Sequence, residues 1–149
     1  MKETFVLGEE DLPVLAKKVS EILSKEEKDK ARVILLEGDL GAGKTTFTKA
    51  LARELGVDGE EVHSPTFILK KEYRTQHPTW KRLVHVDAYR FTHPDEARVL
   101  RLEEDLNDPN TVLVVEWPSK MTYLASDVEL EFAVHDEEMR DITLSYEER

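Results

Sequence analysis

Apolar residues follow two different spacings along this chain, and segments of the two kinds alternate. Short continuous apolar runs rich in β-branched residues occupy residues 31–36, 83–86 and 112–115, as is typical of buried parallel strands. Apolar residues three to four positions apart mark residues 12–23 and 45–55, as is typical of helices with one buried face. Strands that alternate with helices predict an α/β fold built around a mostly parallel sheet.

The remaining patterns complete one predicted domain over residues 1–149. They predict a short strand at 4–7, a half-exposed strand at 66–73, a helix at 93–106, a helical turn at 118–124 and a closing antiparallel pair at 128–134 and 141–146. Asp11 is expected to cap the first helix, and Gly56 to end the helix over residues 45–55. The sequence contains no internal repeat, low-complexity tract or linker that would divide it.

A glycine-rich segment lies between the strand at 31–36 and the helix at 45–55. It reads Gly38-Asp39-Leu40-Gly41-Ala42-Gly43-Lys44-Thr45 and fits the pattern G-x-x-x-x-G-K-[ST] at every fixed position. Glycines allow the tight turn that directs backbone N–H groups at phosphate oxygens, and the following helix adds the positive end of its dipole. Lys44 is expected to reach the β- and γ-phosphates, and the Thr45 hydroxyl to bind Mg²⁺. The segment predicts a P-loop NTPase-like three-layer sandwich with antiparallel C-terminal strands.

Two acidic residues end predicted strands beyond this loop. Asp87 follows the apolar run 83–86, and Glu116 follows the run 112–115. Ligands of open α/β sheets bind at the carboxyl ends of the strands, so both acids are candidates to anchor Mg²⁺ or to orient a water molecule. Either acid alone could equally close a strand beside solvent or cap a helix.

Composition narrows the classes of function. The 149 residues include 32 acidic and 21 basic side chains, which give a formal net charge of −11. This balance argues against an extended nucleic-acid groove and suits a basic protein partner. The sequence has no cysteine, which excludes disulfides and cysteine-ligated metals. No apolar stretch is long enough for a membrane span and no signal peptide opens the sequence, so we expect a soluble cytoplasmic protein without a membrane partner.

Three functions are compatible with these motifs: an ATPase, a small-molecule kinase, and a nucleotide-sensing binding module that does not hydrolyse its ligand. A GTPase is disfavoured because the sequence has no Asn-Lys-x-Asp tetrapeptide. The kinase is weakened because kinases of this fold usually carry an arginine-rich lid, whereas the arginines between residues 74 and 101 are scattered.

Four segments, in this order and at this spacing, resemble the bacterial TsaE family, also called YjeE. They are Gly38-Asp39-Leu40-Gly41-Ala42-Gly43-Lys44-Thr45-Thr46, Ser64-Pro65-Thr66-Phe67, His85-Val86-Asp87-Ala88-Tyr89-Arg90 and Glu116-Trp117-Pro118. The resemblance covers nearly the whole chain. It implies an ATPase with ATP and Mg²⁺ as cofactors, which acts with the TsaB–TsaD complex in threonylcarbamoyl modification of adenosine 37 in tRNAs that read codons starting with A. It further implies that ATP hydrolysis resets this complex between turnovers, and that tRNA is met only through the complex.

The resemblance also assigns roles to residues by position. Nucleotide contacts are expected from the phosphate loop, residues 38–46, that is Gly38, Asp39, Leu40, Gly41, Ala42, Gly43, Lys44, Thr45 and Thr46, and from Thr66, Trp117 and Arg140. Catalytic roles are expected for Lys44, Asp87 and Glu116, and metal contacts for Thr45, Asp87 and Glu116, with the direct ligand among the two acids left open.

Other readings of these residues stay open. Trp117 could fill the core, Thr66 could merely follow a Ser-Pro turn, and His85 is expected to pack or to hydrogen-bond rather than to ligate a metal. The adenine pocket is expected near Gly8 or the C-terminal strands. No arginine finger in cis is evident, so the chain alone is expected to hydrolyse ATP slowly.

Overall fold

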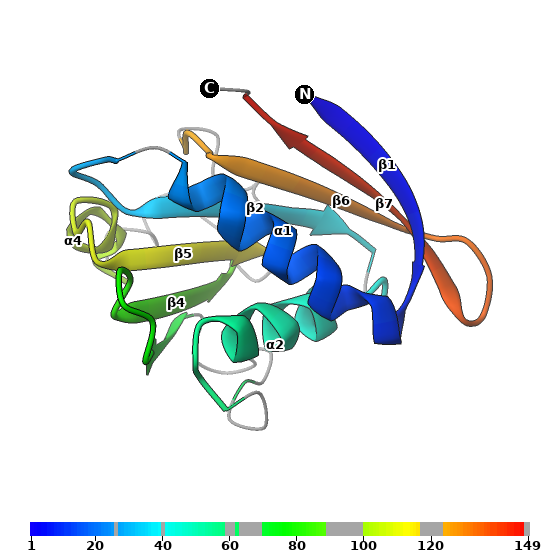
Figure 1. Ribbon diagram of the computed structural model, residues 1–149, viewed down its shortest axis with the longest axis horizontal. Coiled ribbons are helices and arrows are strands. Elements are labelled where there is room, and N and C mark those ends of the chain that lie inside the picture. The colour runs from blue at the N-terminus through cyan, green and yellow to red at the C-terminus, as the bar shows by residue number, and fades with distance from the viewer. Residues whose placement is uncertain are drawn as a thin grey trace.

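Seven strands form one mixed sheet in the computed structural model, and helices cover both of its faces (Figure 1). The structure describes residues 1–25, 27–39, 41–58, 62, 70–88, 100–116 and 124–147. In chain order the described elements are β1 (Lys2–Gly8), the 3-10 turn η1 (Glu9–Asp11), α1 (Leu12–Ser24), β2 (Arg32–Gly38), α2 (Lys44–Glu54), β3 (Lys70–Arg74), β4 (Arg82–Asp87), α4 (Leu102–Leu106), β5 (Thr111–Glu116), β6 (Val128–Val134) and β7 (Met139–Tyr146).

The strands are ordered β1-β7-β6-β2-β5-β4-β3 across the sheet. The four central strands β6, β2, β5 and β4 run parallel to one another, and antiparallel pairings close both edges. The predicted antiparallel pair near the C-terminus is therefore present as β6 and β7. An additional pairing joins β1 to β7, and the Met1 amine donates a hydrogen bond to the Tyr146 carbonyl oxygen, 2.6 Å away.

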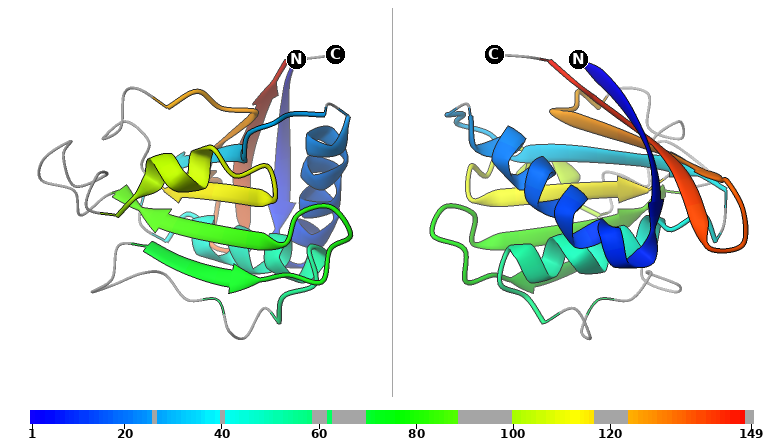
Figure 2. Two further views of the ribbon diagram at one scale, coloured as in Figure 1. Left: turned by 90° about the vertical axis from the view of Figure 1, so that its left-hand side faces the viewer. Right: turned by 45° about the vertical axis from the view of Figure 1, so that its right-hand side comes forward.

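Alternate residues of the central strands point to opposite faces of the sheet and supply two separate cores. Ile34 and Leu36 of β2 pack with α1 and α2, whereas Val33 and Leu35 pack with Leu102 of α4. Figure 2 shows α4 on the opposite side of the sheet from α1 and α2. The predicted α/β three-layer sandwich is confirmed, and it explains why β2, β4 and β5 contain continuous apolar runs: both of their faces are covered.

Local details refine the predicted elements. The Asp11 side chain does not cap α1, because a 3-10 turn comes first and Asp11 Oδ2 instead accepts the N–H of Gly8 at 3.0 Å. Gly56 does end α2 with a φ of +88°, and its N–H donates to the carbonyl oxygen of Arg53 at 3.0 Å. Of the strand predicted at 66–73, the structure describes residues 70–73, which belong to β3. Of the helix predicted at 93–106, it describes residues 100–106, which include α4. The helical turn predicted at 118–124 lies outside the described residues, apart from Leu124.

Candidate functional site

The phosphate loop joins the end of β2 to the start of α2 and depends on three glycines with positive φ. Gly38, Gly41 and Gly43 have φ angles of +147°, +80° and +108°. A Cβ on Gly38 would lie 2.4 Å from the carbonyl oxygen of Phe132, so a side chain there would collide with the backbone of β6. The glycines therefore set both the turn and its close approach to the neighbouring strand. Leu40 lies outside the described residues.

Lys44 is the first residue of α2 and is buried. The residue is 5% exposed, and Nζ donates to the carbonyl oxygens of Gly38 and Asp39 within the same loop. Burial lowers the pKa of Lys44, an effect that the nearby carboxylates of Glu116 and other acids only partly oppose. The ammonium group of Lys44 is thus directed at the phosphate loop, where two backbone carbonyl oxygens accept its hydrogen bonds.

Asp87 and Glu116 lie on neighbouring parallel strands at directly paired positions of the sheet. Both side chains are buried, at 7% and 3% exposed, at the carboxyl ends of β4 and β5. Because successive side chains of a strand point to opposite faces, Glu116 lies on the same face of the sheet as Val112 and Val114, which pack in the core under α1 and α2. On this face Thr45 Oγ1 donates to Glu116 Oε1 at 3.3 Å. The structure thus brings together the two acids that sequence analysis singled out and the start of α2.

His85 occupies the position two residues before Asp87, so its side chain points to the same face of β4. It is fully buried, and its Nε2 lies 3.5 Å from Glu116 Oε1. The predicted packing role of His85 fits this burial. Its contact with Glu116 was not predicted, although the alternation along residues 83–87 already placed His85 and Asp87 on one face.

A cavity of about 580 Å³ opens at this edge of the sheet, a size suited to a nucleotide. Its lining joins the two acids and the loop to the end of β1 and to the β6–β7 hairpin: Leu7, Gly8, Glu9, Glu10, Leu12, Gly41, Ala42, Gly43, Lys44, Thr45, Thr46, Asp87, Glu116, Phe132, Glu137, Glu138, Met139, Arg140 and Ile142. The expectation of ligand contacts near Gly8 and the C-terminal strands therefore coincides with the cavity wall. Sequence analysis missed Phe132, although alternation along residues 128–134 places it on the inner face.

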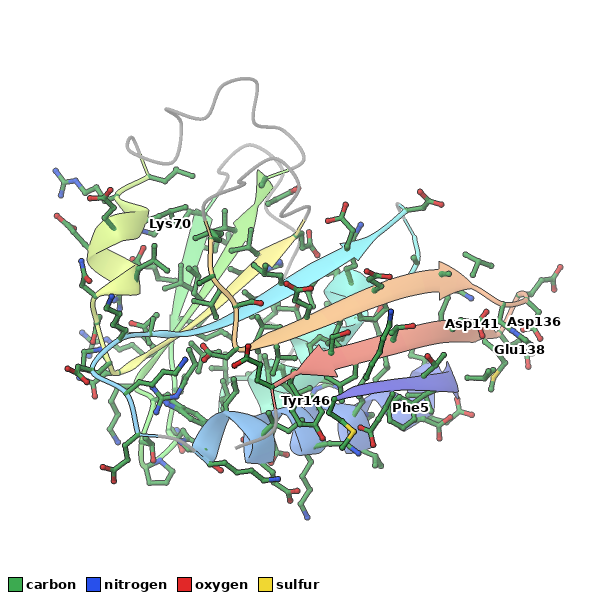
Figure 3. All side chains as sticks on the ribbon, turned by 90° about the horizontal axis from the view of Figure 1, so that it is seen from above. Phe5, Lys70, Asp136, Glu138, Asp141 and Tyr146 are labelled. Carbon is green, nitrogen blue, oxygen red and sulfur yellow. The ribbon has the colours of Figure 1, made fainter. Side chains whose placement is uncertain are left out.

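Arg140 lies at the wall of this cavity, at the start of β7. Its Nη2 donates to the carbonyl oxygen of Gly41 at 3.3 Å, and its Nη1 donates to Asp136 and Met139 carbonyl oxygens at 3.0 and 2.9 Å. These contacts tie the hairpin to the phosphate loop. Figure 3 shows the acidic residues Asp136, Glu138 and Asp141 gathered at this end of the hairpin, with Lys70 near α4 across the molecule.

The oxygen atoms at the site fit a magnesium ion that arrives with phosphate. Thr45 supplies a hydroxyl and Glu116 a carboxylate within 3.3 Å of each other, and Asp87 lines the same cavity. Mg²⁺ keeps several waters and is usually bound through one or two carboxylates plus substrate phosphates. Within the described ranges no three His, Cys, Asp or Glu side chains converge on one point. Thr66 and Trp117 fall outside the described residues, and their predicted contacts stay predictions.

Comparison with known proteins decides the family. The family model described as "Threonylcarbamoyl adenosine biosynthesis protein TsaE" matches residues 8–142. This chain belongs to the TsaE family. The resemblance inferred from the four sequence segments is therefore confirmed, and the match spans the loop, both acids and Arg140.

Individual members of the TsaE family agree with this assignment. The tRNA threonylcarbamoyladenosine biosynthesis protein TsaE of Aquifex aeolicus is 36% identical over 145 residues, which cover 97% of this chain and 96% of that protein. The protein of the same name from Streptomyces coelicolor is 41% identical over 123 residues, 76% of this chain and 78% of that protein. The crystal structure of YdiB from Bacillus subtilis superposes with a TM-score of 0.68 at 26% identity, over 97% of this chain and 84% of that one. Among the described helices of this TsaE chain, none is long and apolar enough to cross a membrane.

Proposed function

We propose that this chain binds ATP with Mg²⁺ and hydrolyses it to ADP and phosphate, in the service of tRNA threonylcarbamoyladenosine biosynthesis. The observation that carries the proposal is the convergence of Lys44, Thr45, Asp87 and Glu116 on one cavity beside a glycine loop. Membership of the TsaE family supports the pathway, because relatives across nearly the whole chain are named for it. The phosphate loop supports the nucleotide.

The residues of the loop would bind the phosphates of ATP. Backbone N–H groups of residues 41–45 would surround the phosphate oxygens, and Lys44 would leave the carbonyl oxygens of Gly38 and Asp39 to contact the β- and γ-phosphates. Bound Mg²⁺ would neutralise charge on the transferring phosphoryl group. Thr45 would hold the metal with one of the two acids, and the other acid would orient the attacking water.

The opposite wall of the cavity would hold the base and the ribose. Leu7, Leu12, Phe132 and Ile142 contribute apolar surface, while Glu9, Glu10, Glu137 and Glu138 add acidic side chains. Carboxylates repel further phosphate but accept hydrogen bonds from ribose hydroxyls and from an exocyclic amine. The nucleotide would therefore lie with its phosphates at the loop and its base toward β1 and the β6–β7 hairpin, next to Arg140.

We further propose that hydrolysis is slow in the isolated chain and rises when the TsaB–TsaD complex binds. An arginine finger is worth 10³–10⁵ in rate in related phosphoryl-transfer enzymes. In the part of the chain that the structure describes, the one arginine lining the cavity is Arg140, and its guanidinium is engaged by backbone carbonyl oxygens. A partner that supplies a cation, or that orders the site, would complete the catalytic site. ATP hydrolysis would then reset the TsaB–TsaD complex between turnovers.

The test is ADP release from ATP·Mg²⁺ by the chain alone, then with TsaB, TsaD and tRNA added. We expect a slow basal rate that rises at least tenfold with the complex. Release that depends on a small-molecule acceptor would identify a kinase instead. ATP-dependent binding to the complex without ADP release would identify a sensor.

Glu116→Gln serves as the matched variant because it keeps the shape of the side chain and removes its charge. It should lower stimulated ADP release by about 10²- to 10⁴-fold while ATP still binds. A rate unchanged by this substitution, or fast turnover that is indifferent to the complex, would overturn the proposed mechanism.

A further inference from the structure

His85 is a fully buried polar residue in a strand whose other interior residues are aliphatic. Its exposed fraction is 0%, and within the described residues no atom makes a hydrogen bond to either ring nitrogen. Leu83, Val84 and Val86 of the same strand are also 0% exposed. A buried polar group without a partner costs about 1–3 kcal/mol, so a position that served packing alone would be better filled by leucine or valine.

Glu116 is the polar group toward which the imidazole is directed. His85 pairs across the sheet with Val114, so Glu116 is its diagonal neighbour on the next strand and faces the same side. Nε2 lies 3.5 Å from Glu116 Oε1, slightly longer than an ordinary hydrogen bond. The hydroxyl of Thr45 donates to this same oxygen from the start of α2 at 3.3 Å.

We propose that His85 is a positioning residue for Glu116, an inference that rests on the proposed ATPase function. The Nε2–H of His85 and the hydroxyl of Thr45 would hold Oε1 from two sides, and this leaves Oε2 of Glu116 directed into the cavity. This 3.5 Å contact would shorten to a hydrogen bond when the nucleotide fills the cavity, as catalytic contacts commonly do. His85 itself does not line the cavity, so it acts only through Glu116.

This arrangement explains why the carboxylate needs a second donor. A glutamate has three rotatable side-chain bonds, and one contact with Thr45 leaves its plane free to turn. A second donor from β4, which belongs to the rigid sheet, fixes the carboxylate independently of any movement of α2 and the loop. Groups that orient catalytic or metal-binding side chains in this way typically change activity or metal affinity 10- to 100-fold when they are removed.

The hydrogen bond can be tested without enzymatic turnover. We would record imidazole ¹⁵N–¹H NMR spectra of the native chain with ATP·Mg²⁺ and with ADP, and assign His85 among the five histidines by its loss in His85→Gln. We expect a solvent-protected Nε2–H proton whose shift moves in Glu116→Gln. A proton on Nδ1 with a bare Nε2, or a signal insensitive to Glu116→Gln, would overturn the inference whether or not the chain hydrolyses ATP.

The positioning role is tested by two variants of similar size. His85→Gln can still donate a proton near the Nε2 position, whereas His85→Met fills the same space without a donor. We expect kcat to fall about tenfold or more in His85→Met and to recover to within about threefold of native in His85→Gln, with the Kd for ATP nearly constant in both. In a Glu116→Gln background the same substitutions should have no further effect.

Leu83→Met provides the packing control, since Leu83 faces the same core from the same strand, two positions away from His85. It should leave kcat unchanged while lowering the melting temperature slightly. If kcat in the His85 variants follows the melting temperature rather than the presence of a donor, the residue is structural and the inference is wrong. Absence of any turnover in the native chain would instead refute the proposed ATPase function, and the NMR result would still decide the contact.

Discussion

The two ends of strands β4 and β5 carry charged residues that are used in opposite ways. Where the strands begin, Arg82 donates to Asp105 and Asp108 at 2.8 and 2.9 Å and to Thr111 at 3.1 Å. Where they finish, Asp87 and Glu116 are paired across the sheet and line a cavity. At the first end the charged side chains form ion pairs and hydrogen bonds with one another. At the second end Asp87 and Glu116 line a cavity that can hold a ligand. The contrast separates residues that hold the sheet together from residues that would act on a substrate.

The network at the first end is centred on Asp105 of α4. This carboxylate is 3% exposed, accepts a hydrogen bond from Arg82 through Oδ1 at 2.8 Å, and forms an ion pair with Lys70, whose Nζ lies 2.7 Å from Oδ2. Burial by itself would lower the pKa of Arg82, but the hydrogen bonds to Asp105 and Asp108 outweigh it and raise that pKa. A buried carboxylate with two cationic partners fixes α4 on the sheet.

The largest effect should come from Glu116→Gln at the ligand end. We expect stimulated ATP turnover to fall by about 10²- to 10⁴-fold, because the carboxylate that would orient water or hold the metal is lost. The melting temperature should stay constant or rise, since one of two acids at paired strand positions becomes neutral. Coupled ADP-release assays and thermal unfolding of the same preparations measure both quantities, and a large loss of stability would contradict the contrast between the two ends.

Asp105→Ala should have the reverse profile. Removing the shared carboxylate leaves Lys70 and Arg82 without their buried partner, which should cost about 3 kcal/mol of unfolding free energy and roughly 10 °C of melting temperature. The Kd for ATP should change little. Glu104→Ala on the exposed side of the same helix is the control, with an expected change within about 0.5 kcal/mol. A loss of ATP binding with stability preserved would show that the two ends are not separate.

At low pH the protein should lose stability in part because Asp108, in the network where β4 and β5 begin, becomes protonated. Burial would raise the pKa of Asp108, but hydrogen bonds from the Asn110 N–H and from Arg82 outweigh it and lower that pKa below the ordinary 3.8. The unfolded chain therefore binds this proton more readily, so the stabilisation is present above about pH 4 and is lost as the pH falls through the lowered pKa. Urea unfolding between pH 3 and 6 should show a shallower acid loss for Asp108→Asn than for the native chain; parallel curves would rule out this contribution.

The smallest effect should be a gain in stability from Lys44→Met. Burial lowers the pKa of Lys44, so the charged form costs free energy in the folded protein below that lowered pKa, and the cost disappears as the pH rises toward 10.5. The variant should melt slightly higher than the native chain at pH 7, by about 1 kcal/mol or less, and the difference should close near pH 10. Nucleotide binding should be lost. A variant that melts lower at pH 7 would show that the bonds from Lys44 to the loop carbonyl oxygens outweigh the cost of burial.

The sequence predicted the parts of the fold that follow from local periodicity. The apolar runs before Asp87 and Glu116 became β4 and β5, and the helical spacing after the loop became α2. The pairing of β1 with β7 was not predicted, because nothing local in either strand specifies a partner so far away along the chain. The capping role of the Asp11 side chain was wrong although α1 does begin at Leu12: the carboxylate of Asp11 instead accepts the N–H of Gly8, at the start of a 3-10 turn that periodicity does not reveal.

Some features of the candidate site could likewise be predicted from the sequence, and others could not. The loop and the two acids could be named in advance, because each follows a strand and the ends of parallel strands meet at one edge. The contact between His85 and Glu116 and the position of Phe132 beside Gly38 depend on register between strands, which periodicity alone does not give. Contacts within a turn can be predicted from the sequence. Contacts between diagonal neighbours on two strands cannot, because they depend on the strand register.

The pairing of β1 with β7 also has a consequence for biosynthesis. Leu7 and Gly8 form part of the cavity wall, yet among the described strands of the sheet their strand pairs only with β7, and the backbones of Met1 and Tyr146 meet across 145 residues. At translation speeds of about 5–20 residues per second, β1 waits on the order of 10 s for its partner to leave the ribosome. The strand before the phosphate loop, β2, also waits for its neighbours β5 and β6, which follow it by more than 70 residues. A nascent chain would thus complete both its phosphate-binding turn and its nucleotide cavity only with the last strands.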